Sequence, residues 1–358
     1  MRFIVLLAAS LVGSAPAAQA QVPAPAAPDA APAAAFWSVW NESLRFAPAK
    51  LSVPRRIAGA EYYESTEFSR KGEGVDTAVK YRSADQKIFA TLYVYYPSIA
   101  HTGVQAIATD QAIRSARSPN IRSLGAGVAS AGGRPNVAVT SDYDHYLGDN
   151  RTRAAFIKAG RWMLKLRVTG PESRSAEVAA VMKALLDGLR FEGEVKPSPA
   201  EPIRAGECAA AERPDAAIGS DGGEAANVAM ADAAGADKKG FAGRIGGEWC
   251  RTLLPVRDQK MAVLQATGKG RPDGDSALLM LYSDGGGVLE VVRLAKDSYL
   301  LLHHGIAEVN VLDAYDRLPS LAQIGRFFVE PVQVRARVKL SPDGGPEIQL
   351  PGSVEDKH

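Results

Sequence analysis

The side chains of this chain that could do acid–base or metal chemistry lie mainly in two short runs. In the first run, His303 and His304 are adjacent, and Asp313 and Asp316 follow them. They could supply a general base or a metal ligand, or simply form a polar pair at the end of a strand. Adjacent residues of a strand point to opposite faces, so the two histidines are not expected to share one metal ion.

The second run, DYDHYLGDN, begins at Asp142 and also offers Asp144, His145 and Asp149 as oxygen and nitrogen ligands. Alternation along a strand would place Asp142 and Asp144 on one face and His145 on the other. The run lacks the spacing of an EF-hand calcium loop. We therefore interpret it as a solvated strand end followed by a turn.

Local motifs of catalysis are missing from the sequence. It has no G-x-S-x-G, no P-loop, no H-E-x-x-H, and no G-x-G-x-x-G placed between a strand and a helix. We expect no catalytic residue, no metal site and no cofactor. The favoured function is a non-catalytic binding or envelope-assembly module. The alternative is a hydrolase or metal-dependent enzyme that uses His303 or the Asp142/Asp144/His145 group.

The stretch from Gly160 to Phe191 predicts a strand followed by an amphipathic helix. Trp162, Leu164, Leu166 and Val168 alternate with polar or charged residues and Met163. Thr169-Gly170-Pro171 then breaks the strand and starts the helix. The apolar stripe of that helix is formed by Val178, Val181, Met182, Leu185, Leu186 and Leu189. Neither element can bury its apolar side alone, so we expect the helix to pack on a sheet that contains the strand.

The segment before this stretch predicts further elements of the same sheet. Val75 to Tyr81 and Ile88 to Tyr96 form a hairpin, and the second strand is apolar or aromatic on both faces, as in a central strand covered on both sides. We expect a helix from Thr102 to Arg117, a Gly/Ser-rich loop from Leu124 to Pro135, and a strand from Asn136 to Tyr146. Residues 36–194 are thus expected to form an α+β sandwich domain with a largely antiparallel sheet and packed helices.

The late strand and helix resemble those of the PsbP-like and DcrB-like envelope proteins. The residues that carry the resemblance are Gly160, Trp162, Lys165, Arg167, Leu186, Leu189, Arg190 and Phe191. It covers less than half of the chain. The resemblance implies a binding or assembly module, and it transfers no catalytic motif.

Residues 195–247 are rich in Pro, Gly and Ala and predict a low-complexity linker. Four short strands with close turns then predict an antiparallel meander. A helix from Leu318 to Phe328 and an edge strand from Val332 to Leu340 complete a second, smaller β-rich domain with one helix, at residues 248–340. Residues 341–358 are interpreted as a tail.

The N-terminal residues predict export. Arg2, an apolar run and an A-x-A site ending at Ala20 form a signal peptide over residues 1–20, so the mature chain should begin at Gln21. Residues 21–35 are a Pro/Ala-rich tether. Trp37 and Trp40 then fall at helical spacing. They could form a contact surface for a partner, or fold back on their own domain.

Cysteine content and charge narrow the class of protein. Cys208 and Cys250 are the only cysteines, and in an oxidising compartment we expect them to form a disulfide. The 42 Lys and Arg residues nearly balance the 40 Asp and Glu residues, which argues against a nucleic-acid binder. We expect a periplasmic or secreted protein without a transmembrane anchor, whose partner is an unidentified envelope protein or small ligand.

Overall fold

The structure is a computed structural model that describes residues 36–69, 72–115, 120–209, 213–219, 241–257, 259–268, 276–295 and 298–350. The predicted signal peptide, its cleavage site between Ala20 and Gln21, and the tether at 21–35 lie outside the described residues. Within the described ranges, no helix is long and apolar enough to cross a membrane.

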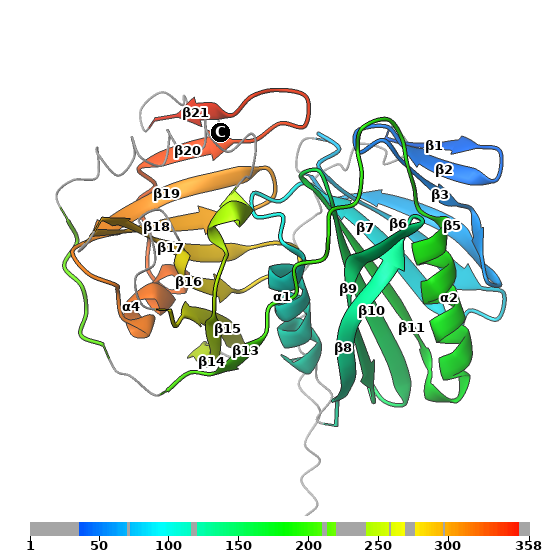
Figure 1. Cartoon of the computed structure of the whole chain (residues 1–358), viewed down its shortest axis with the longest axis horizontal. Coiled ribbons are helices and arrows are strands. Elements are labelled where there is room, and N and C mark those ends of the chain that lie inside the picture. Colours follow the sequence, from blue (N-terminus) through cyan, green and yellow to red (C-terminus); the bar gives the residue numbers. More distant parts are fainter. Residues whose placement is uncertain are drawn as a thin grey trace, which may run out of the picture.

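The expected α+β class with packed helices is wrong. The described residues form a β-rich fold of three sheets and three short α-helices, namely α1 (Thr102–Ser115), α2 (Ser175–Gly188) and α4 (Leu321–Gly325) (Figure 1). One source of the error is the stretch from Leu124 to Pro135, whose small residues suggested a loop. Most of it is strand, because its backbone pairs with the following segment even though it has few large side chains to bury.

The first half of the chain contains two of the sheets. A four-stranded sheet has the order β1 (Trp37–Trp40), β2 (Ser43–Phe46), β3 (Leu51–Pro54), β12 (Arg190–Phe191). An eight-stranded sheet has the order β4 (Arg56–Ile57), β5 (Ala60–Glu67), β6 (Asp76–Ser83), β7 (Phe89–Tyr95), β11 (Trp162–Pro171), β10 (Asn150–Ala159), β9 (Arg134–Asp144), β8 (Arg122–Ala131). All neighbours in both sheets are antiparallel.

One face of the eight-stranded sheet is buried by α2 and by the small sheet. Leu164 and Leu166 of β11 and Val181 of α2 are all in the same core cluster, at 0–1% exposure. Trp37 stacks on Phe46, and Phe46 contacts the edge of Trp162. The periodic apolar residues of strand and helix therefore meet as the sequence predicts.

The second half forms a nine-stranded sheet. Its order is β13 (Ala205–Glu207), β14 (Trp249–Val256), β15 (Gln259–Ala266), β16 (Ser276–Leu281), β17 (Val288–Ala295), β18 (Ser298–His304), β19 (Glu308–Tyr315), β20 (Ala336–Lys339), β21 (Glu347–Gln349). Every neighbour from β14 onward is antiparallel, and only β13 runs parallel to its neighbour. Helix α4 covers one face, where Ile324 joins the core.

Helix α1 lies between the eight-stranded and nine-stranded sheets, whereas α2 lies on the outer side of the first half (Figure 1). Helix α1 packs on β9 and β10 on one side and on β15 and β16 on the other. The halves also pair directly, since Pro97 bridges Ile306 and the N–H of Ala307 donates to the carbonyl of Tyr96 over 2.8 Å. The two halves thus share one helix and a backbone junction.

Candidate functional site

The adjacent histidines, His303 and His304, occupy different environments. His303 contacts the Tyr282 hydroxyl through Nε2 and Asn310 through Nδ1, and burial lowers the pKa of its imidazole. His304 is completely buried. The structure therefore brings neither histidine to a shared metal position.

His304 belongs to a buried Ser–His–Glu chain that sequence reasoning missed. Its Nδ1 lies 2.9 Å from Ser98 Oγ, and its Nε2 lies 2.7 Å from Glu290 Oε2. Arg244 approaches the same carboxylate at 3.8 Å. Ser98 is 2% exposed and Glu290 is 0% exposed, so no substrate reaches these atoms. The hydrogen-bonded series Ser98–His304–Glu290 is a polar link between the two halves rather than a hydrolytic triad.

The run around His145 also forms ion pairs. Asp144, His145 and Glu172 present ligand atoms within 4.8 Å of one another. The Arg122 guanidinium, however, binds the Asp144 carboxylate with two nitrogens and holds the pKa of that carboxyl below its usual range. Asp142 is not in this group, because Arg151 and Arg153 bind it at 2.6 and 2.9 Å. Arg122 already neutralises the carboxylate that a metal would need.

The expected helix with Trp37 and Trp40 is a β-hairpin. Asn41 follows Trp40 with a φ of 51°, a backbone conformation that asparagine tolerates well, and the chain reverses there. Trp37 is buried and its indole N–H donates to Thr77 Oγ1 over 3.0 Å. Of the two tryptophans, Trp40 is the one that lies on the surface, at 63% exposure.

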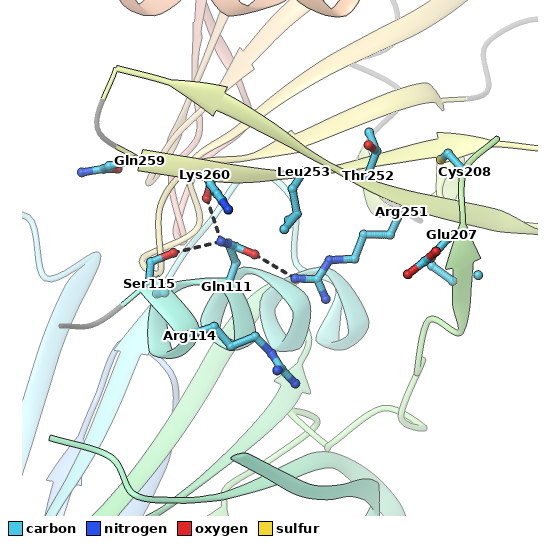
Figure 2. A pocket seen from close by; sticks show the side chains of 13 residues that line it. Gln111, Arg114, Ser115, Glu207, Cys208, Arg251, Thr252, Leu253, Gln259 and Lys260 are labelled. Carbon is cyan, nitrogen blue, oxygen red and sulfur yellow. Dashed lines mark hydrogen bonds between the residues drawn. The ribbon is translucent and has the colours of Figure 1, made fainter. Parts of the chain in front are cut away.

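A cavity with convergent polar groups opens between the two halves, and we call it the inter-sheet cleft (Figure 2). Its volume is about 1090 Å³. It is lined by the last turns of α1 and by three strands of the second half, through Gln111, Ala112, Arg114, Ser115, Ala205, Gly206, Glu207, Cys208, Arg251, Thr252, Leu253, Gln259 and Lys260.

Gln111 fixes the wall of the cleft. Its amide nitrogen donates to Ser115 Oγ over 2.9 Å and to the Lys260 carbonyl over 2.8 Å, while its amide oxygen accepts from Arg251 over 2.9 Å (Figure 2). The helix that carries it is capped by His101, whose Nδ1 accepts from the backbone N–H of Gly103 over 3.2 Å. These bonds hold the polar wall in one arrangement before any ligand arrives.

Positive charge exceeds negative charge at the cleft. The single carboxylate of Asp110 binds both Arg114 and Arg251 at 2.9 Å. Lys260 adds an exposed ammonium that makes no ion pair with any described residue, and Glu207 is the one carboxylate in the lining. Three cations thus face two carboxylates, and a small anion would complement this excess.

The predicted disulfide between Cys208 and Cys250 is confirmed, and it lies at the wall of this cleft. It joins the residue after β13 to β14. The sequence predicted the bond but indicated no binding site beside it. Sequence reasoning missed Gln111, Arg251 and Lys260, because they come from separate segments and share no local motif.

The lining can bind but offers little for catalysis. Its hydroxyls come from Ser115 and Thr252, its one sulfur-bearing residue is the disulfide-bonded Cys208, and it contains no histidine. A nucleophile next to a base is therefore absent from the lining residues.

A second group of titratable side chains lies where the sheets meet. Lys165 of β11 is 5% exposed and bonds Asp284, from the β16–β17 turn, at 2.5 Å. Burial lowers the pKa of Lys165, and Asp284 opposes this shift. Burial, with a smaller contribution from Glu67, raises the pKa of Asp76 on β6 to about 7, and Lys165 opposes this shift. Asp76 thus holds its proton up to near neutral pH.

We expect Asp76→Asn to stabilise the protein at pH 8 and to leave stability near pH 4 unchanged. The folded-state pKa lies above the ordinary 3.8, so the contribution of Asp76 to stability is most favourable below about pH 4 and is lost as the pH rises to about 7. A shift of this size corresponds to roughly 4 kcal/mol, and since local relaxation offsets part of it we expect about 2 kcal/mol.

Urea unfolding at both pH values measures this effect. Asp149→Asn, at an exposed position, is the matched control. A variant that is no more stable than wild type at pH 8 would contradict the prediction.

Comparison of the chain with models of known protein families and with curated proteins finds no match. The resemblance to the PsbP-like and DcrB-like proteins stays a prediction.

Proposed function

We propose that this protein is an exported, non-catalytic binding protein that takes a small anionic molecule in the inter-sheet cleft. The observation that carries the proposal is the excess of cations over carboxylates around a wall already fixed by Gln111. A cavity of about 1090 Å³ at the junction of two structural units is a common place for a ligand site. The lack of a nucleophile–base pair in the lining favours binding over turnover.

Two observations support a periplasmic or secreted location. The first twenty residues have the charge, apolar run and cleavage site of a signal peptide. The Cys208–Cys250 disulfide is stable in an oxidising compartment and would be reduced in most cytosols.

Isothermal titration of the full mature chain with citrate and inorganic phosphate tests the ligand class. We expect binding of at least one of these anions at millimolar concentration or below. The double variant Arg114→Gln/Lys260→Gln should weaken it about tenfold or more, since each charged hydrogen bond contributes about 1.5 kcal/mol.

The double variant Arg134→Gln/Lys196→Gln removes the same net charge from exposed positions outside the lining and should bind like wild type. Equal affinity in both double variants would mean that the anion binds elsewhere. If neither citrate nor phosphate binds, the proposed ligand class is contradicted.

A further inference from the structure

The face of the eight-stranded sheet that carries α1 is covered unevenly. Helix α1 packs on β9 and β10, and the β16–β17 turn reaches Tyr95 and Lys165. Farther along β7 the same face opens to solvent, because Phe89 is 46% exposed. The sequence predicts a β7 covered on both sides, but the structure covers only the opposite face completely, with Ala90 and Leu92 at 0–1% exposure.

Exposed aromatic side chains gather on this open part, which we call the aromatic face. Four of the described aromatic side chains are exposed. Trp40 lies elsewhere, on β1, and the other three lie here: Tyr63 at 40%, Phe68 at 48% and Phe89 at 46%. Phe68 stacks on Tyr93 with ring centres 6.4 Å apart. Exposed rings present large, rigid contact areas that lose little entropy on binding.

Two guanidinium groups on the aromatic face are held by rings and not by acids. Arg82, directly opposite Phe89, lies 4.8 Å from the centre of the Tyr63 ring. Arg167, which is half-buried, lies 4.6 Å from the centre of the Tyr146 ring, and its Nη2 is buried without a hydrogen-bond partner. Neither arginine forms an ion pair with a described residue.

The neighbouring charges on this face are already paired. Lys80 binds Glu64 at 3.2 Å. Glu61, which lies opposite Arg82 in the sheet, binds Arg56 at 3.0 Å instead. Arg82, which is exposed, and the accessible part of the half-buried Arg167 are therefore left with N–H donors that a carboxylate or another anionic group could accept.

The combination of flat rings and two available guanidiniums selects the class of ligand. Aromatic rings stack on the flat faces of sugar rings, and guanidinium groups bind carboxylates with paired hydrogen bonds. A single-stranded nucleic acid also stacks on aromatic residues, but it carries a phosphate at every nucleotide and needs a continuous basic groove. Here Glu61 and Glu64 interrupt the basic residues, so a chain with fewer charges fits better.

We propose that the aromatic face binds an acidic oligosaccharide, with sugar rings on Tyr63 and Phe89 and its carboxylates on Arg82 and Arg167. The site is separate from the inter-sheet cleft, with which it shares no residue. It does not depend on the function proposed for that cleft.

Calorimetric titration of the full mature chain with a hexasaccharide of alternating glucuronate and N-acetylglucosamine tests the proposal. We expect saturable binding that is at least tenfold tighter than that of neutral hexa-N-acetylchitohexaose and of a thymidine hexanucleotide. Arg82→Gln/Arg167→Gln should weaken binding at least tenfold, and so should Phe89→Ala at its exposed position. Circular dichroism should show that these variants keep the fold.

Two variants separate this site from general charge effects and from the cleft. Arg134→Gln/Lys196→Gln loses the same charge at exposed positions, and Arg114→Gln/Lys260→Gln alters the cleft; both should bind the hexasaccharide like wild type. Unchanged affinity in Arg82→Gln/Arg167→Gln, or no binding of the acidic hexasaccharide, would overturn the proposal. Tighter binding of the hexanucleotide would overturn it in favour of a nucleic-acid surface.

Discussion

Glu290→Ala should lower the free energy of unfolding by about 3–5 kcal/mol, the usual cost of removing one member of a buried ion pair. The carboxylate is fully buried and contacts His304 at 2.7 Å, Ser276, and Arg244 at 3.8 Å. Its removal leaves buried donors and a nearby cation without their shared acceptor. Urea unfolding monitored by tryptophan fluorescence at pH 7 measures the loss.

The pKa of Glu290 gives the prediction a pH dependence. Burial opposes its ionisation, but the hydrogen bond and charge of His304, with Arg244, hold its pKa below the ordinary value. Its stabilising contribution is therefore present above about pH 4.5 and is lost as the pH falls through the lowered pKa. Glu330→Ala, at an exposed position, is the control. A loss below about 1 kcal/mol for Glu290→Ala would show that the pair is replaceable.

Cys208→Ser/Cys250→Ser should cost about 4 kcal/mol, because the disulfide closes a loop with a sequence separation of 42 and restricts the unfolded chain. The bond also joins the segment after β13 to β14, so its loss frees one wall of the inter-sheet cleft. We expect a lower melting temperature and weaker anion binding in the same variant.

Thermal unfolding of the oxidised wild type and of the double serine variant measures the effect. The reduced wild-type protein should behave like the variant, since both lack the same covalent link. A variant that melts within about 2 °C of the oxidised protein would contradict the prediction.

The sequence predicts those parts of the fold in which side-chain period and backbone pairing agree. The β6–β7 hairpin, α1, and the β11–α2 unit with Leu164 and Val181 in one core all form where the pattern indicates. The segment from Trp37 to Trp40 fails because a spacing of three suits a helix, whereas the turn at Asn41 decides the structure. Strand β8 fails because Gly and Ala carry no periodic signal.

The cleft was much harder to predict than the fold. Gln111 and Lys260 are 149 residues apart and meet only because α1 lies between two sheets. Sequence patterns describe neighbours along the chain, and no single segment here contains enough of the site to be recognised. The one residue of its lining that was predicted to form a specific contact was Cys208, through its disulfide with Cys250.

The position of α1 has a consequence for how the chain reaches its native state. The helix is synthesised well over a hundred residues before β15 and β16, on which one of its sides packs. During synthesis that side has no native surface to meet until β15 and β16 have been made, so the nascent chain leaves part of α1 uncovered. Incomplete chains of this size tend to aggregate through such surfaces. Production of this protein should therefore depend on a holding chaperone until its last third has emerged.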